Sequence, residues 1–503
     1  MIYKKKDGGN ANIMIKKEQK HQATPMDYII QNRKQKVKDF INSGISPYPA
    51  RYVLDKNNSD IQKDFVFLER GQMSDVKVKV VGRIMTYRNM GKVAFFDIRD
   101  GYAKIQVYVR QDRIGMYQYG LFKNMIDVSD IVAVEGTPFK TRTNEFSIMA
   151  EKWTMLTKAL RPLPEKWHGL KDVETRYRQR YLDLIMNNEV KDIFVKRSLI
   201  ISSIRHKLEE LGFIEVETPI LQSLAGGANA KPFTTHHNTL NMSLFLRVAP
   251  ELFLKRLVIG GMDKVFEIGK NFRNEGIDKN HNPEFTMIEL YKAYSDYNDM
   301  MDVAETLIKT AAEKIGSTVN LEFRRAKMFE LIKEYAGLDL LPHIEDAKMF
   351  ELVKHLNLDL PKDASNKKIL DQIFEEKVLP NLKNPTFVID YPAIYSPLSK
   401  VKFNQPEIAE RFELYMNGME VGNAYSELND PELQKKKFVQ QMEMKNKECD
   451  EDVMPYDEDF IFALEQGLPP TGGLGIGIDR LVMILTMVKS IREVITFPTM
   501  RYW

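Results

Sequence analysis

The stretch "DKVFEIGKNFRNEGIDKNHNPEFTMIELYKAY", residues 263–294, decides the fold of the larger part of this chain. Its two ends alternate apolar and polar residues, as strands do. The segment between them, 271–285, is longer than a hairpin turn of roughly two to five residues. It holds several side chains that donate, accept or stack: Arg273, Glu275, Lys279, His281, Glu284 and Phe285. Because loops of this kind usually carry function, we expect two strands joined by a functional loop.

Length and composition predict a soluble protein of several domains. The chain has 503 residues, of which 43% are hydrophobic and 28% charged, and this length is too great for one core. No apolar run approaches the ~18 residues of a membrane span, and no secretory signal is visible. The single cysteine, Cys449, excludes an intramolecular disulfide and a cysteine-only zinc cluster. We therefore expect a cytoplasmic protein without membrane association.

The net charge of +3 excludes a chain that is basic throughout, although residues 1–25 form a lysine-rich tail. Such a tail is typical of a solvated, disordered segment. The alternatives are an extension that touches RNA and a transit peptide, the latter disfavoured by the absence of arginine before Arg33.

Periodicity divides the rest of the N-terminal third into a helical segment and a barrel. Residues 26–74 start with helical spacing over 26–44, whereas 75–155 alternate with period two, and Asp100-Gly101 has the form of a hairpin turn. Several short strands in about 80 residues indicate a small barrel such as an OB-fold, a frequent oligonucleotide binder. Phe95, Gln106, Tyr108 and Arg83 on its exposed face could stack on bases and read their edges; the alternative is a purely structural β-domain.

The remaining chain has the pattern of a mixed helix-and-strand domain. A proline-marked linker covers 156–180, and the domain spans 181–503. Within it we expect a helix near 192–211, a strand at "FIEVETPIL" (213–221), and a mainly helical insertion around 325–380.

Two acids in "RFELYMNGMEVGNAYSELND" (411–430) are candidate metal ligands. Asn417-Gly418 predicts a two-residue turn that pairs Tyr415 with Glu420 and Glu413 with Gly422. Glu413 and Glu420 then share one face, about 7–8 Å apart at the backbone, which suits Mg²⁺. The alternative is a pair of exposed strand acids. Asn423 faces the other way unless the strand is bulged near Gly422.

The C-terminal "GGLGIGIDRLVMILT" (472–486) places glycines on a strand before an apolar helix. It is not a dinucleotide fingerprint, because Arg480 stands where a third glycine belongs. Glycines on a strand indicate a close approach to the backbone: tight strand–helix packing, or a phosphate or flat ring against Arg480. Together with Arg273, His281 and Phe285, this predicts a nucleotide clamp for phosphoryl chemistry.

Six segments, in order, resemble a known enzyme family. "FIEVETPIL", "NFRNEG…HNPEF" and "GLGIGIDR" resemble motifs 1, 2 and 3 of the class II aminoacyl-tRNA synthetases. "GGANAKPF" (226–233), "RVAPELFLKRL" (247–257) and "NAYSELNDP" (423–431) are similar to the lysyl-tRNA synthetases among them. The resemblance covers about 26–500. It implies an α+β protein in which an N-terminal OB-fold β-barrel precedes a class II catalytic domain, an antiparallel sheet flanked by helices.

The resemblance also implies an activity and its participants. A homodimer would join L-lysine to tRNA(Lys) by way of lysyl-adenylate, with ATP as co-substrate and Mg²⁺ as cofactor. For ATP, it implies a catalytic Arg273 at the α-phosphate together with Glu275, His281, Phe285 and Arg480. For lysine, it implies Gly227, Glu251, Tyr291, Asn423 and Glu427; for Mg²⁺, Glu413 and Glu420; for the anticodon, Phe95, Gln106, Glu145 and Arg83. Glu289 points the same way as Tyr291 along a strand and is a further pocket candidate.

Three rivals stay open at this point. An aspartate or asparagine ligase of the same subclass should present a cation to its substrate, whereas this chain presents Glu251 and Glu427. A lysine ligase that modifies a protein should lack the N-terminal barrel. A non-catalytic RNA-binding relative should have lost the ATP ligands.

Overall fold

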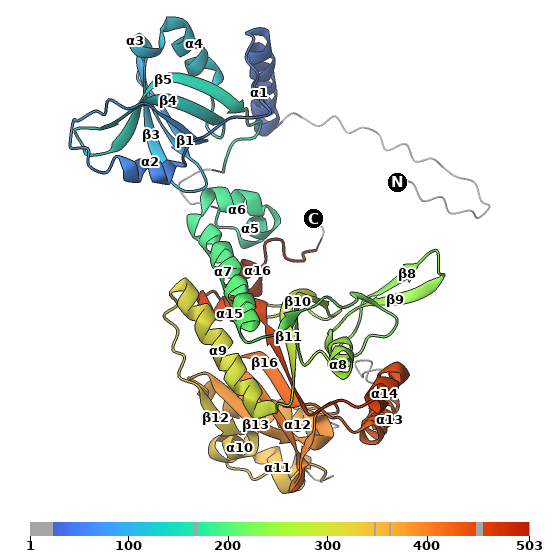
Figure 1. Ribbon diagram of the computed structural model, residues 1–503. Helices are drawn as coiled ribbons and strands as arrows, with labels where there is room; N and C mark the ends of the chain where they lie inside the picture. The colour runs from blue at the N-terminus through green and yellow to red at the C-terminus, as the bar shows by residue number, and fades with distance from the viewer. Residues whose placement is uncertain (1–23, 165–169, 347–348, 362–363, 449–455, 502–503) are drawn as a thin grey trace. The chain divides into compact units, whose positions relative to one another are not determined.

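The computed structural model describes residues 24–164, 170–346, 349–361, 364–448 and 456–501 (Figure 1). It divides into two compact units, residues 1–167 and 168–503. Almost all of the predicted basic tail, and Cys449, lie outside the described residues. No helix among those described is long and apolar enough to cross a membrane.

The first unit is a closed five-stranded barrel with the strand order β1-β2-β3-β5-β4. The strands are β1 (Val78–Asn89), β2 (Val93–Arg99), β3 (Lys104–Arg110), β4 (Ile131–Lys140) and β5 (Phe146–Thr157). Helices α3 (Gln111–Ile114) and α4 (Met116–Met125) connect β3 to β4. The parallel pairing of β3 with β5 closes the barrel, as in an OB-fold. The predicted turn at Asp100-Gly101 is confirmed, since β2 and β3 are antiparallel neighbours.

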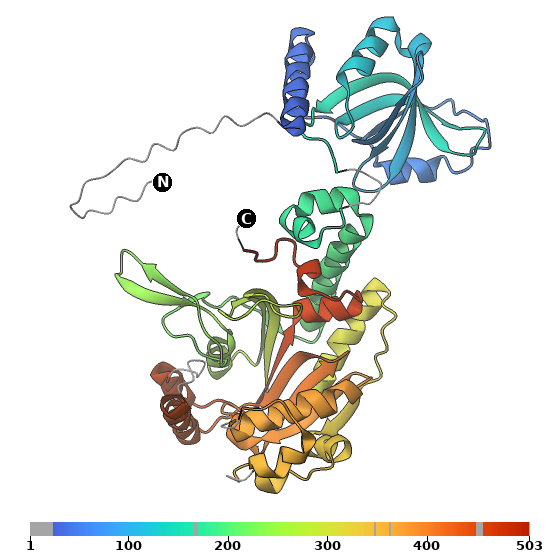
Figure 2. The ribbon, with the colours of Figure 1, turned by 180° about the vertical axis from the view of Figure 1, so that it is seen from behind.

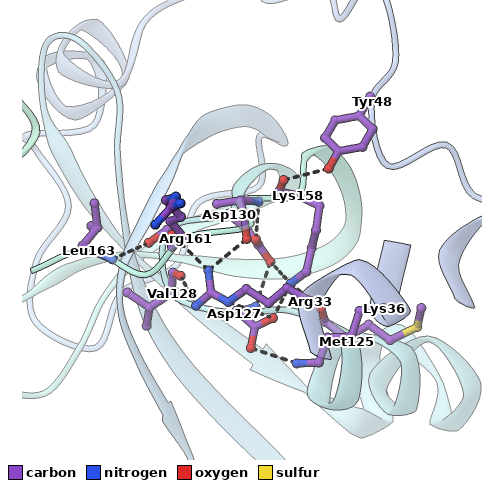
Figure 3. Close-up of polar contacts among 12 residues, drawn as sticks. Arg33, Lys36, Tyr48, Met125, Asp127, Val128, Asp130, Lys158, Arg161 and Leu163 are labelled. Atoms are coloured by element: carbon purple, nitrogen blue, oxygen red, sulfur yellow. Dashed lines mark hydrogen bonds and ion pairs between the residues drawn. The ribbon is translucent and has the colours of Figure 1, made fainter. Parts of the chain in front are cut away.

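Helix α1 (Pro25–Asn42) confirms the helical pattern over 26–44, and a second helix, α2, covers Asn58–Asp64. A buried ion cluster ties α1 to the barrel (Figure 3). The Lys158 ammonium donates to Asp130 at 2.8 Å and also contacts Asp127. From α1, Lys36 reaches Asp127 at 2.8 Å, and Arg33 donates to the carbonyls of Val128 and Ala159. Because Lys158 and Asp130 are fully buried, the removal of either partner would leave a costly uncompensated charge.

The second unit is built on a nine-stranded sheet with the order β12-β13-β15-β16-β17-β11-β10-β6, with β14 paired to β15. Its strands are β6 (Ile214–Glu215), β10 (Lys264–Phe272), β11 (Glu284–Ala293), β12 (Arg324–Lys327), β13 (Thr386–Pro392), β14 (Val401–Lys402), β15 (Gln405–Met416), β16 (Met419–Ser426) and β17 (Thr471–Gly477). The interior pairs are antiparallel as predicted, whereas the edge strands β12 and β6 run parallel to their neighbours. A separate small sheet contains β7 (Leu221–Gln222), β9 (Met242–Leu246) and β8 (Thr234–His237).

Helices cover the sheet, and two of them lie side by side on one face (Figures 1 and 2). These two, α7 (Asn188–Glu210) and α9 (Tyr297–Ile315), pack apolar residues against Ile288, Leu290 and Ile476 of the sheet. The other helices are α5 (Val173–Arg178), α6 (Arg180–Met186), α8 (Glu251–Ile259), α10 (Met328–Ala336), α11 (Met349–Val353), α12 (Asn366–Ile373), α13 (Pro431–Glu448), α14 (Glu458–Glu465), α15 (Ile478–Leu485) and α16 (Ile491–Val494). The functional groups described below lie on the opposite face of the sheet.

Some predicted elements differ in extent from the observed ones. The strand expected at 213–221 is wrong in its middle, where Pro219 cannot donate to a ladder, and only β6 and β7 form. The helix expected at 192–211 begins earlier, at Asn188. The segment 156–180 contains the end of β5 and helix α5, and 325–380 contains β12 residues as well as α10, α11 and α12.

Candidate active site

The opening stretch of sequence forms two neighbouring antiparallel strands, β10 and β11, as predicted, with the loop between them. On β11, Ile288 and Leu290 enter the core, so Phe285, Met287, Glu289 and Tyr291 project from the other face. Strand β17 pairs with β11 and places glycines opposite these side chains, Gly473 beside Tyr291 among them. Because glycines stand on this face of β17, there is room for a cleft here.

A cavity of about 620 Å³ lies on this face of the sheet. It brings together every residue of the second unit that the sequence nominated for ATP, lysine or Mg²⁺: Gly227, Glu251, Arg273, Glu275, His281, Phe285, Tyr291, Glu413, Glu420, Asn423, Glu427 and Arg480. Glu289 lines it as well. Residues more than 250 positions apart in the sequence thus share one cleft.

Two arginines provide the positive charge at one end of the cleft. The Arg273 guanidinium lies 5.2 Å from the centre of the Phe285 ring, and its buried Nε has no hydrogen-bond partner. Arg480 donates to the Glu420 carbonyl at 2.7 Å and lies 2.9 Å from Nε2 of His281. This end of the cleft therefore offers planar donors that suit phosphate oxygens.

The two acids nominated for a metal lie on the β15–β16 hairpin, whose turn residues Asn417 and Gly418 have positive φ as predicted. Tyr415 pairs with Glu420 as expected, but the pairing of Glu413 with Gly422 is wrong: Glu413 faces Asn423. A bulge at Val421 causes this shift.

The bulge turns Asn423 to the face of the hairpin that carries the acids, and Arg411 contacts both Asn423 and Glu413. Arg411 Nε donates to Asn423 Oδ1 at 3.1 Å, and Arg411 Nη2 lies 2.5 Å from Glu413 Oε1. Tyr415 and Tyr391 donate to the other Glu413 oxygen at 2.6 and 2.9 Å. The sequence analysis missed Arg411, although it stands two residues before Glu413 on the same face of the strand.

Each of the two acids is ion-paired with an arginine, Glu413 with Arg411 at 2.5 Å and Glu420 with Arg480 at 3.5 Å. Desolvation in the cleft, and then the neighbouring Glu413, raise the pKa of Glu420. Among the described residues, no group of three or more His, Cys, Asp or Glu is placed to hold a metal ion. Two carboxylates leave most of a cation's coordination sphere open, which fits Mg²⁺ bound jointly with phosphate oxygens.

The other end of the cleft is a buried acidic pocket next to the ammonium group of Lys255. Glu251 accepts hydrogen bonds from Lys255 at 2.6 Å and from Tyr425 at 2.8 Å. Lys255, fully buried, also forms an ion pair with Glu427. Sequence reasoning missed Lys255 and Tyr425; the spacing of Lys255 four residues after Glu251 on α8 was the available signal.

Close packing at two glycines shapes this pocket. Gly227 has φ +90°, and a Cβ there would lie 3.0 Å from Glu251 Cβ. A Cβ at Gly473 would lie 2.0 Å from Glu427 Oε1 and 2.6 Å from Tyr291 Cε1. The side chains of Glu427 and Tyr291 therefore both lie against Gly473.

Burial sets the protonation of the pocket acids. Burial, and then Glu251, raise the pKa of Glu289 to about 8, and Tyr291 donates to Glu289 at 3.4 Å. Burial also raises the pKa of Glu427, and the Lys255 ammonium opposes that rise. Burial alone would lower the pKa of Lys255, but Glu251 and Glu427 outweigh it and raise that pKa, which favours the charged ammonium.

The barrel carries a second, smaller cavity of about 360 Å³. It is lined by Arg88, Met90, Phe95, Gln106, Thr141, Arg142 and Thr143. The Phe95 ring stacks on Tyr108 with centroids 4.4 Å apart, and Ser147 donates to Gln106 at 2.9 Å. Glu145 is exposed in the adjoining loop, where its backbone pairs with Thr141.

Arg83 is not brought to this cavity. It faces Arg99, four residues along β2 from Phe95, and donates to the Ser129 carbonyl at 2.8 Å. Arg88 faces Phe95 instead. The sequence analysis missed Arg88 and Arg142.

The chain is also similar in sequence to known proteins. Residues 172–501 match the family model described as tRNA synthetases class II (D, K and N), and residues 78–156 match that of the OB-fold nucleic acid binding domain. The chain is 49% identical over 491 residues to a lysine–tRNA ligase of Pelotomaculum thermopropionicum, covering 95% of each chain. It is 50% identical to that of Clostridium tetani (94% of this chain, 96% of the relative) and 48% identical to that of Carboxydothermus hydrogenoformans (95% and 98%).

Proposed function

Since this chain belongs to the class II tRNA synthetases of the D, K and N group, we propose that it ligates lysine to tRNA(Lys) at the expense of ATP. The supporting observation is the similarity to lysine–tRNA ligases along 94–95% of the chain, combined with an acidic pocket in the cleft. The reaction has two steps. The lysine carboxylate attacks the α-phosphate of ATP and pyrophosphate leaves; a hydroxyl at the tRNA 3′ end then attacks the acyl carbon and AMP leaves.

Arg273 is the catalytic residue of the first step. Negative charge grows on the α-phosphate as the carboxylate attacks, and a fixed guanidinium stabilises that charge. Its unpartnered Nε and its position over Phe285 support this role, because the donor is already held in place.

The remaining ATP groups divide between the base and the outer phosphates. Phe285 and Arg480 hold the adenine between them, and Glu275 lies by the adenine and the incoming tRNA end. His281, in contact with Arg480, binds the outer phosphates. Glu413 and Glu420 would hold Mg²⁺, which would neutralise phosphate charge.

The acidic end of the cleft selects lysine. Glu251 and Gly227 receive the α-amino group, Asn423 lies near the carboxylate, and Glu427 with Tyr291 binds the ε-ammonium. Buried acceptors of this kind reject analogues that lack the amine. Lys255 is the cation that an aspartate or asparagine pocket would need, but it is flanked by Glu251 and Glu427, and an aspartate would meet their repulsion.

The barrel recognises the anticodon. Phe95 stacks on a base, Gln106 and Glu145 read base edges, and Arg88 and Arg142 bind the phosphate backbone of this single-stranded loop. Arg83 lies away from this cavity and has no part in the proposal.

The active form is a homodimer in the cytoplasm. Apolar side chains of the first motif are exposed in the single chain, Ile214 at 53%, Ile220 at 44% and Leu221 at 48%, and so is Leu224 just after it, at 40%. A patch of this kind is typical of a protein–protein interface, and a second copy would cover it.

Charging of tRNA by labelled lysine tests this proposal. Wild-type protein should form lysyl-tRNA with a tRNA that bears a lysine anticodon, and Arg273→Ala should lose at least ~10²-fold in rate, as a single charge-stabilising donor does. The control is Arg324→Ala, which removes a half-exposed arginine from the edge strand β12 and should retain the wild-type rate. If Arg273→Ala charges tRNA within a few-fold of wild type, Arg273 is not the catalytic residue.

A further inference from the structure

The acidic pocket already contains one ammonium of the protein itself. Lys255 Nζ lies 2.6 Å from Glu251 Oε1 and forms an ion pair with Glu427 Oε2. The rings of Tyr291, Tyr425 and Phe460 surround it with centroids at 6.0, 5.6 and 5.8 Å. Two acids and three aromatic faces form a complete ammonium site, and Lys255 fills it.

Lys255 makes the two carboxylate oxygens of Glu427 different from each other. Neither buried oxygen has a hydrogen-bond partner, but Oε2 forms an ion pair with Lys255 and Oε1 forms none. An unpaired buried carboxylate oxygen is costly, so Oε1 is the atom prepared for an incoming donor. Tyr291 lies beside it at Gly473.

The charge of the pocket depends on the same lysine. Its titratable groups are Glu251 and Lys255 from α8, Glu289 and Tyr291 from β11, Tyr425 from β16, and Glu427 directly after β16. Glu289, with a pKa of about 8, is mainly protonated at pH 7. Glu251 and Glu427 would repel each other if both were charged, and Lys255 is the first opposing influence on the protonation of Glu427.

We propose that Lys255 is a positioning residue for the substrate: it favours the ionised form of Glu427, fixes its Oε2, and so presents Oε1 to the side-chain ammonium of the amino acid. This inference rests on the proposed specificity for lysine. Once Glu427 is ionised, the pocket has two carboxylates and one resident ammonium, which leaves one negative charge for one side-chain cation.

The test is the variant Lys255→Met in amino-acid-dependent exchange of pyrophosphate into ATP between pH 6 and 8.5. Without the ammonium the pKa of Glu427 rises further, and each pH unit below that pKa lowers the ionised fraction about tenfold. The KM for lysine should therefore rise at least ~10-fold at pH 7 and rise further as the pH falls, whereas the KM for ATP stays within twofold.

The control is Lys309→Met, which removes the lysine of another Glu-to-Lys pair at the same four-residue spacing on α9, 2.5 Å from Glu305 and exposed. It should leave both KM values and their pH dependence unchanged. If Lys255→Met fails to fold, Lys255→Gln keeps N–H donors but removes the charge and should give the same pH-dependent loss.

A folded variant whose KM for lysine stays within twofold of wild type from pH 6 to 8.5 would overturn the inference. A KM raised by the same factor at every pH would overturn it too, because a purely structural defect does not titrate. Failure of the wild-type protein to exchange with lysine would instead refute the proposed function, and the two results are distinguishable.

Discussion

The substitution Gly473→Ala adds a single methyl group and tests the geometry of the amino-acid pocket. The residue lies on β17 opposite Tyr291, and a Cβ there would come within 2.0 Å of Glu427 Oε1 and 2.6 Å of Tyr291 Cε1. Gly473→Ala therefore pushes on the two side chains that are proposed to bind the ε-ammonium.

The size of the effect follows from those distances. Real Cβ contacts are essentially never under 3.0 Å, so the Glu427 carboxylate must move by about 1 Å. It cannot simply rotate into solvent, since Glu427 is 1% exposed and ion-paired with Lys255. A displacement of about 1 Å costs on the order of 10²-fold, or ~2.7 kcal/mol.

Pyrophosphate exchange at varied lysine and varied ATP separates this effect from general damage. We expect kcat/KM for lysine to fall about 100-fold and the KM for ATP to change less than threefold. The matched control is Gly477→Ala on the same strand, where the nearest atom to the new Cβ is 3.7 Å away and the nearest side chain is Arg480, not Glu427; it should leave kcat/KM for lysine unchanged.

Two results would refute this reasoning. If Gly473→Ala uses lysine as well as Gly477→Ala does, then Glu427 and Tyr291 do not form the ammonium site. If both variants lose lysine and ATP binding equally, then any added side chain on β17 disturbs the cleft, and the loss does not come from the contact with Glu427 and Tyr291.

Three further predictions concern the barrel and pH. Phe95→Ala should weaken tRNA charging by the ~1–3 kcal/mol of one base stack and leave tRNA-free pyrophosphate exchange unchanged; equal loss in both assays would contradict it. Glu289, with a pKa of about 8 when folded and about 4.3 when unfolded, binds more protons in the folded state between these values. The free energy of unfolding should therefore fall as pH rises from about 5 to 8, by up to ~1.4 kcal/mol per unit, and Glu289→Gln, measured by thermal unfolding, should show a shallower fall. Lys158→Met should destabilise the barrel unit by roughly 3–5 kcal/mol, because it leaves Asp130 buried and unpaired, whereas Lys56→Met, which breaks an exposed pair with Asp64, should cost about 0–1 kcal/mol in denaturant titration.

Local patterns in the sequence were sufficient for the strands and loop of the cleft. Alternation over 264–272 and 284–293 defines β10 and β11, and the long segment between them required a loop. The Asn417-Gly418 turn likewise fixed the first pairs of the β15–β16 hairpin.

The bulge at Val421 could not be predicted, because it depends on tertiary pairing. Strand β16 also pairs with β17, and a Cβ at Gly422 would lie 3.1 Å from the Gly475 carbonyl oxygen. The close approach of these two backbones is encoded in residues some 50 positions apart, and a local pattern does not show it.

The same holds for the resident cation and for the barrel arginines. The spacing of Glu251 and Lys255 is visible in the sequence, but the contact with Glu427 exists only after α8 packs beside the end of β16. Arg83 and Arg88 lie on one strand with a register shift between Ile84 and Thr86, so the alternation along the strand did not reveal which arginine faces Phe95.

The most direct test of lysine activation is pyrophosphate exchange with each of the twenty amino acids in the presence of Mg²⁺. Selection by Glu427 and Tyr291 predicts strong exchange with lysine alone. Exchange with aspartate or asparagine in its place would contradict the pocket assignment while keeping the family, and no exchange with any amino acid would contradict the enzymatic function itself.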